Sequence, residues 1–294
     1  MKRSDFLKSM LLASLATKGM GLKALDHWSK TATPTAKMPV LFLGHGSPMN
    51  AIEENEFVAG FRNIGKQISS PRAILCISAH WETKGTRITA MEHPRTIHDF
   101  GGFPEALYQQ QYPAPGSPQL AKETAGLITS APVEMDHDWG LDHGAWTVIK
   151  HMYPNANVPV IQMSLDYTKP PQYHYELAQQ LAALRNKGVL IVGSGNMVHN
   201  LRLVAWDKLQ ADNYGYDCTL EAREFMNNCI VSGSHDPLIH YARQGTALQK
   251  AIPTPEHFLP LLYVLALQEK GEQAELFNDK ALGGSLTMTS VSIS

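Results

Sequence analysis

The placement of histidines is the first sign of chemistry in this chain, which carries 13 of them among 294 residues. Imidazole is the commonest metal ligand among side chains. Three histidines, His45, His80 and His199, each follow an apolar run typical of a β-strand. The strands of an α/β sheet present ligand-binding groups at their carboxyl ends, so we expect these three side chains to converge on one point.

A fourth histidine, His257, lies between prolines in 253–260 (PTPEHFLP), where a helix is expected to begin. The prolines restrict the backbone that presents this side chain. A lone histidine is usually structural, but four at strand ends or in a rigid turn favour metal ligation. Six other histidines lie in helix-like or polar stretches and are interpreted as structural: His27, His93, His151, His174, His235 and His240.

The glycines of 193–195 (GSG) have two interpretations. A phosphate-binding loop would need a third glycine or a Lys-Ser/Thr ending, and both are missing. We favour the other interpretation, in which the small residues let the backbone pack closely beneath a ligand histidine. The segment 44–48 (GHGSP) is not a nucleophile elbow, because Ser47 is not the central residue of Gly-x-Ser-x-Gly.

Two further segments each have two interpretations that the sequence supports about equally. In 142–146 (DHGAW), Asp142 is expected either to orient a neighbouring imidazole or to cap a helix, and Trp146 to wall an aromatic pocket. The segment that begins at His98 (HDFGGFP) is typical of a substrate-binding loop and equally of tight turn packing. It belongs to a long stretch rich in Gly, Pro and aromatic residues, 82–117, that we expect to line a site.

Apolar runs alternate with helix-like segments from residue 38 onward. Strands are predicted at 39–43, 73–79, 158–163 and 189–192, and helices at 54–67, 118–129, 173–187 and 218–231. Strands that are apolar on both faces suit a sheet covered by helices on each side. The sequence therefore predicts one three-layer α/β domain, residues 38–294, with a central mostly parallel sheet and a metal site at its carboxyl edge.

Residues 1–37 differ from the rest. Lys2 and Arg3 precede a short apolar run, a pattern typical of a degraded twin-arginine export signal and equally of a helical extension. The location is accordingly cytoplasmic or, if the signal works, periplasmic. No apolar run is long enough for a membrane span. The formal net charge of −2 gives no reason to expect nucleic acid as a partner. The three cysteines do not suggest a disulfide framework. An oligomer is compatible with the sequence.

Taken together, the motifs resemble extradiol ring-cleaving dioxygenases of the DOPA 4,5-dioxygenase type, in the class III superfamily of protocatechuate 4,5-dioxygenase. Six segments carry the resemblance in order, from about residue 38 to the C-terminus: 44–50 (GHGSPMN), 78–82 (SAHWE), 96–104 (TIHDFGGFP), 142–146 (DHGAW), 193–200 (GSGNMVHN) and 254–261 (TPEHFLPL).

The resemblance implies a single metal ion held by His45, His80 and His257. His199 matches the acid/base of the superfamily, with a fourth metal ligand as the alternative, and His143 matches a histidine that is expected to face the substrate. The wider superfamily uses two histidines and a carboxylate. An all-histidine set also suits zinc, so the isolated protein is expected to hold Fe(II) or Zn(II).

The activity implied is the opening of a catechol ring, such as that of DOPA, with O2 to a semialdehyde; from DOPA this product would cyclise to betalamic acid. Zinc has no redox chemistry, so ring opening requires Fe(II). Two other functions use the same histidines. One is a zinc-dependent hydrolase or lyase, which would work without oxygen, and the other is a non-catalytic metal-binding protein.

Overall fold

Eight strands form one mixed sheet in the order β4-β3-β5-β2-β6-β1-β10-β7, and β8 and β9 form a separate hairpin. The structure is a computed structural model that describes residues 36–294. The strands are β1 (Val40–Gly44), β2 (Ala73–Thr83), β3 (Thr86–Thr89), β4 (Val133–Asp136), β5 (Val160–Asp166), β6 (Val189–Gly195), β7 (Ala274–Phe277), β8 (Ala281–Leu282), β9 (Leu286–Thr287) and β10 (Ser290–Ile293).

The centre of the sheet is parallel. Strands β5, β2, β6 and β1 run in one direction, whereas β10 pairs antiparallel with β1 and with β7. All residues of β1, β5 and β6 are buried, as expected for strands covered on both faces. The prediction of a mostly parallel central sheet is confirmed.

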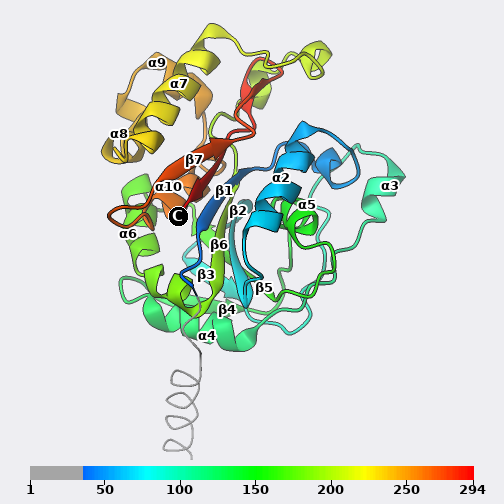
Figure 1. Ribbon diagram of the computed structural model, residues 1–294, viewed down its shortest axis with the longest axis vertical. Helices are drawn as coiled ribbons and strands as arrows, with labels where there is room; N and C mark the ends of the chain where they lie inside the picture. Colours follow the sequence, from blue (N-terminus) through cyan, green and yellow to red (C-terminus); the bar gives the residue numbers. More distant parts are fainter. Residues whose placement is uncertain (1–35) are drawn as a thin grey trace, which may run out of the picture. The chain divides into compact units, whose positions relative to one another are not determined.

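Helices cover both faces of this sheet (Figure 1). The α-helices are α2 (Glu56–Gln67), α3 (Glu105–Tyr108), α4 (Pro118–Leu127), α5 (His143–Met152), α6 (Pro171–Gln179), α7 (Asp217–Val231), α8 (Asp236–Ile239), α9 (Thr246–Ala251) and α10 (Leu259–Leu265). Short 3₁₀ segments are η1 (Pro48–Ala51), η2 (Ala182–Lys187), η3 (Leu201–Leu203), η4 (Trp206–Lys208) and η5 (Tyr241–Arg243).

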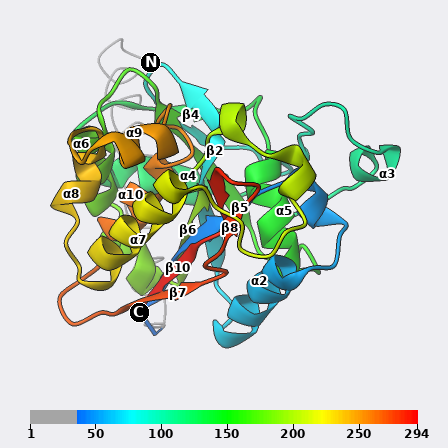
Figure 2. The same ribbon diagram turned by 90° about the horizontal axis from the view of Figure 1, so that it is seen from above.

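Alternate residues of β1 point to opposite layers, because side chains alternate along a strand. Leu41 and Leu43 pack in the core that includes Phe61 of α2 and Trp146 of α5. Their neighbours Val40 and Phe42 pack in the second core, with residues of α6, α7 and α10. Figure 2 shows α2 and α5 on one side of the sheet and α6, α7 and α10 on the other, so the three layers are as predicted.

The predicted elements are all present, but their extent and number differ from the prediction. The single helix predicted at 173–187 is divided into α6 and the 3₁₀ segment η2, which ends at Gly188 with a φ of 76°. The short strands β3, β4, β7 and β10 were not predicted. Lys37–Ser294 form one compact unit, and no helix within residues 36–294 is long and apolar enough to cross a membrane. The expected export signal lies outside the described residues.

Candidate metal centre

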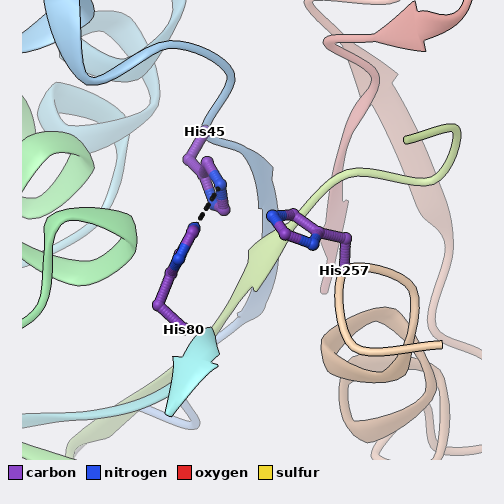
Figure 3. A group of neighbouring side chains, drawn as sticks. All are labelled: His45, His80 and His257. Carbon is purple, nitrogen blue, oxygen red and sulfur yellow. Dashed lines mark hydrogen bonds between the residues drawn. The ribbon is translucent and has the colours of Figure 1, made fainter. Parts of the chain in front are cut away.

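Three histidines from distant segments meet at the carboxyl edge of the parallel strands (Figure 3). His45 directly follows β1, His80 lies near the end of β2, and His257 precedes α10. The Nε2 atoms of His45 and His80 are 3.2 Å apart. One ring nitrogen from each of the three lies within 4.8 Å of the others. The structure therefore brings together three of the four histidines named from the sequence as candidate metal ligands.

His80 reaches this point because β2 changes its pairing. The strand was predicted to end at residue 79, but it continues to Thr83. Its parallel pairing with β6 stops at Ser78, and its register with β5 shifts between Ile77 and Glu82. His80 thus lies in a bulged segment beyond the end of the central ladder. Bulges of this kind redirect side chains, often beside functional sites.

Close packing of β6 against the segment before α10 places His257. A Cβ atom on Gly195 would lie 2.1 Å from the carbonyl oxygen of His257, and one on Gly193 would lie 2.4 Å from that of Pro260. The amide of Asn196 donates to the same His257 carbonyl at 2.9 Å. The glycines therefore serve close backbone approach, the interpretation favoured from the sequence, and not phosphate binding.

The tautomer of His45 follows from its partner. Its Nδ1 lies 3.0 Å from Oγ of Ser194, and this hydroxyl lies 2.5 Å from the carbonyl oxygen of Gly144. A hydroxyl has one proton to donate, and the carbonyl can only accept it. Ser194 consequently accepts from Nδ1–H of His45, and the Nε2 lone pair of His45 is directed toward His80.

Carboxylates face the Nδ1 atoms of the other two histidines. Nδ1 of His257 donates to Oε1 of Glu256 at 3.0 Å. Nδ1 of His80 lies 3.4 Å from Oδ2 of Asp99. Burial tends to raise the pKa of Glu256, but its bonds from His257 and Thr254 lower it to about 2. All three imidazoles thus have an acceptor beside Nδ1 and leave Nε2 for another partner, the arrangement common around metal-bound histidines.

The charge state of the cluster also suits a cation. Burial, and then the neighbouring histidines, lower the pKa values of His45 and His80 well below the ordinary value, so both rings are neutral at neutral pH. At 3.2 Å the Nε2 atoms of His45 and His80 can share a proton in a hydrogen bond or, once both are unprotonated, bind one cation between them. Bonds of about 2.1 Å to one metal, at angles between octahedral and tetrahedral, separate two nitrogens by about 3.0–3.4 Å. The residues present fit a divalent metal ion.

His199 lies beside this group. Its ring stacks on that of His257, with centroids 3.6 Å apart and planes 11° apart. Its ligand atom groups with those of Glu256 and His257 and not with those of His45 and His80. Burial, and then the neighbouring His257, lower its pKa to about 3. His199 is accordingly a neutral imidazole at the edge of the centre.

His143 is the first residue of α5 and adjoins the centre from the opposite side. Its ring centroid is 3.9 Å from that of His80 and 5.6 Å from that of His45. Asp99 holds it twice, with Oδ1 accepting from its backbone amide at 2.8 Å and Oδ2 from its Nδ1 at 2.9 Å. Burial raises the pKa of Asp99, but the bonds from His143 outweigh this and lower it overall.

The aromatic residue that contacts His143 is Phe100, with ring centroids 5.6 Å apart. His98 and Trp146, both expected at the substrate, lie behind it. His98 contacts the Phe100 ring, and its Nε2 donates to the carbonyl of Gln110. Trp146 is fully buried, contacts the His98 ring, and donates Nε1–H to the carbonyl of Ile97.

Two roles were considered for Asp142, capping a helix and orienting an imidazole, and the structure shows the first: Asp142 is the N-cap of α5. Its side chain accepts from the amide of Ala145 and from Ser78 and Gln162, whereas Asp99 orients the imidazoles. Three of the histidines expected to be structural bond to other partners, His151 to Asn50, His174 to Tyr263 and His235 to Tyr175, and a fourth, His240, lies 3.8 Å from Asp236.

Comparison with known proteins agrees with the site. Residues 38–285 match the family described as the catalytic LigB subunit of aromatic ring-opening dioxygenase. The chain is 46% identical to a 4,5-DOPA dioxygenase extradiol of Escherichia coli over 88% of this chain and 96% of that protein. It is 36% identical to one of Beta vulgaris, over 84% and 92% of the two chains.

A solved structure shows the same fold. The crystal structure of an uncharacterized protein from Escherichia coli K12 superposes with a TM-score of 0.75 at 40% identity, covering 87% of this chain and all of that one. The chain belongs to the LigB family of aromatic ring-opening dioxygenases. It is therefore an oxidoreductase of a metal-dependent family whose reaction uses a small molecule and O2.

Proposed function

We propose that this chain is an Fe(II)-dependent extradiol dioxygenase that opens the ring of a catechol of the DOPA type. The observation that carries the proposal is the convergence of His45, His80 and His257, each with an acceptor beside Nδ1, while the Nε2 atoms of His45 and His80 face each other at 3.2 Å. Two relatives that cover most of the chain are named 4,5-DOPA dioxygenase extradiol, which favours DOPA as the substrate.

The overall reaction balances without an external reductant. The carbon–carbon bond next to the diol breaks, and each of its two carbons receives one oxygen atom of O2, so that the ring supplies the electrons that oxygen takes up. Fe(II) held by the three imidazoles would favour the catecholate and pass its electrons to O2. The product is a muconic semialdehyde-type compound.

The chain's own residues move the protons and hold the ring. His199, kept neutral by burial, takes a catechol hydroxyl proton and returns it later in the reaction, a role for positioned imidazole. His143 faces the substrate from the other side of the centre. Phe100 contacts His143 and offers an aromatic face to the substrate ring, supported from behind by His98 and Trp146.

The test is reconstitution with Fe(II) under anaerobic conditions, followed by air and a panel of DOPA, protocatechuate and unsubstituted catechol. The expected ring-opened product has the mass of the substrate plus one O2, less one water once the DOPA product has cyclised, and DOPA is expected to give the highest kcat/KM. Turnover of protocatechuate in preference to DOPA would contradict the proposed substrate. Hydrolysis by the zinc-loaded protein without oxygen, with no ring-opened product from any catechol, would support a zinc hydrolase instead.

A further inference from the structure

One loop carboxylate, that of Asp99, serves two histidines with different tasks. Its Oδ2 lies 2.9 Å from Nδ1 of His143 and 3.4 Å from Nδ1 of His80. Its Oδ1 accepts from the backbone amide of His143 at 2.8 Å. The side chain is 18% exposed, so solvent competes little for these contacts.

These contacts constrain the protons. The backbone amide of His143 can only donate, so it fixes which carboxylate oxygen turns toward the amide and which toward the rings. An ionised carboxylate accepts and cannot donate. Nδ1 of His143, which is hydrogen-bonded to Oδ2, therefore carries a proton and leaves a lone pair on Nε2. The negative charge of Oδ2, 3.4 Å from Nδ1 of His80, favours the same tautomer in that ring.

We propose that Asp99 is a positioning residue that fixes His80 and His143 together as Nδ1–H tautomers. Through one ring it orients a metal ligand, and through the other it presents an acceptor nitrogen to the substrate. The catalytic part of this inference rests on the proposed function, whereas the tautomers themselves do not.

The geometry makes the two tasks interdependent. The rings of His80 and His143 have centroids 3.9 Å apart, and both face Oδ2 of Asp99. A substitution at Asp99 is therefore expected to affect both rings. For His143 the arrangement resembles the aspartate of a serine protease triad, which holds the imidazole in the tautomer that can accept a proton. Phe100, the next residue in the chain, contacts the same ring, so the loop also places the aromatic face.

The first variant is Asp99→Asn, which keeps the size of the side chain and turns one acceptor into a donor. In the full-length zinc-loaded protein, ¹⁵N NMR of the histidine rings reports the tautomer of each, with His143→Gln used to assign the His143 signals. We expect Nδ1–H for His143 in the wild type and Nε2–H in Asp99→Asn. Zinc affinity should fall about 10–100-fold, and kcat of the iron-loaded enzyme about 10²–10⁴-fold.

Two further variants make the result specific. Asp136→Asn is the matched control, because Asp136 accepts from the amides of Asp138 and Trp139 and contacts none of the clustered rings; the ring signals and zinc affinity should not change. Asp99→Glu keeps the acceptor and should restore the Nδ1–H tautomer of His143 with part of the activity.

The wild-type spectrum alone can overturn the inference, even if Asp99→Asn does not fold. An Nε2–H tautomer for His143 in the wild type would contradict it, as would an Asp99→Asn protein that loses thermal stability while the tautomer of His143 stays the same. If the predicted tautomers are found and the iron-loaded wild type opens no catechol, the proposed function fails and the role of Asp99 stands.

Discussion

At the scale of single residues, the site depends on what lies behind each imidazole. Ser194, Asp99 and Glu256 face the Nδ1 atoms of the three proposed ligands. The ligand histidines themselves could be predicted, because apolar runs mark the strand ends at which they lie. Two of their partners could not, although Glu256 adjoins His257: Asp99 follows His80 by 19 residues and Ser194 follows His45 by 149, and no local pattern encodes such contacts.

Replacement of Ser194 by alanine tests the tautomer assigned to His45. The change removes the acceptor of Nδ1–H, so His45 is freed to rotate or to protonate Nε2. We expect metal affinity to fall about 10–100-fold, measured by competition with a chelator. Ser47→Ala is the control, because Ser47 lies two residues from His45 and its hydroxyl accepts from the amide of Met49 and not from His45; unchanged affinity in Ser194→Ala would contradict the assignment.

The variants His45→Ala and His199→Gln separate a ligand from an acid/base. His45→Ala should lose both metal and activity. His199→Gln should keep its metal, because His199 groups with His257 and Glu256 and not with the other two histidines, while turnover falls about 10²–10⁴-fold. Metal content is measured side by side by atomic absorption. Equal metal loss in the two proteins would make His199 a ligand.

At the scale of elements, the site depends on strand ends and on one close approach. The four central strands were predicted, because their apolar runs are continuous. Strands such as β4 and β7 were missed, since each has only four residues, none of them fully buried, and includes an exposed glutamate. The extension of β2 past residue 79 was also missed, because its bulge depends on pairing with β5 and β6.

Gly195→Ala tests the approach of β6 to the segment that carries His257. The new Cβ would lie 2.1 Å from the His257 carbonyl oxygen, so the segment must shift. We expect the free energy of unfolding to fall by about 1–3 kcal/mol, with weaker metal binding. Gly126→Ala in α4 is the control: its Cβ meets nothing within 4 Å, and stability should stay the same or rise by up to about 1 kcal/mol. Denaturant unfolding and metal titration of both proteins decide the point.

At the scale of the whole molecule, one buried cation ties the first strand of the unit to the segment that follows α10. Arg185, 1% exposed, donates to the carbonyls of Met38 and Leu267 and to both carboxylate oxygens of Glu272. It thereby joins the start of β1 to the segment that follows α10. His257 lies just before the other end of this helix. The general architecture could be predicted from alternating strands and helices, but this connection could not, because it joins residues 147 positions apart.

Glu272→Gln tests this connection through its pH dependence. Burial tends to raise the pKa of Glu272, but the bonds from Arg185 lower it from 4.5 to about 2. A depressed pKa contributes stability that is fully present above pH 4.5 and lost as the pH falls toward 2. At neutral pH the variant should be less stable by about 3 kcal/mol, since Arg185 stays buried without its partner.

The difference in the free energy of unfolding between wild type and Glu272→Gln should shrink between pH 4.5 and 2. Urea denaturation at a series of pH values measures it. Glu275→Gln, at an exposed position of β7, is the control and should match the wild type throughout. A difference that stays constant down to pH 2 would show that the ion pair does not cause the effect.

The central claim is that the histidine centre uses a redox-active metal to put O2 into a catechol. The most direct measurement is oxygen uptake, in an electrode, by the protein loaded with Fe(II) or with Zn(II) and supplied with DOPA. Zinc has no redox chemistry, so the account predicts one O2 consumed per DOPA opened by the iron-loaded protein and none by the zinc-loaded one. Equal activity with zinc, or turnover that continues without oxygen, would contradict it.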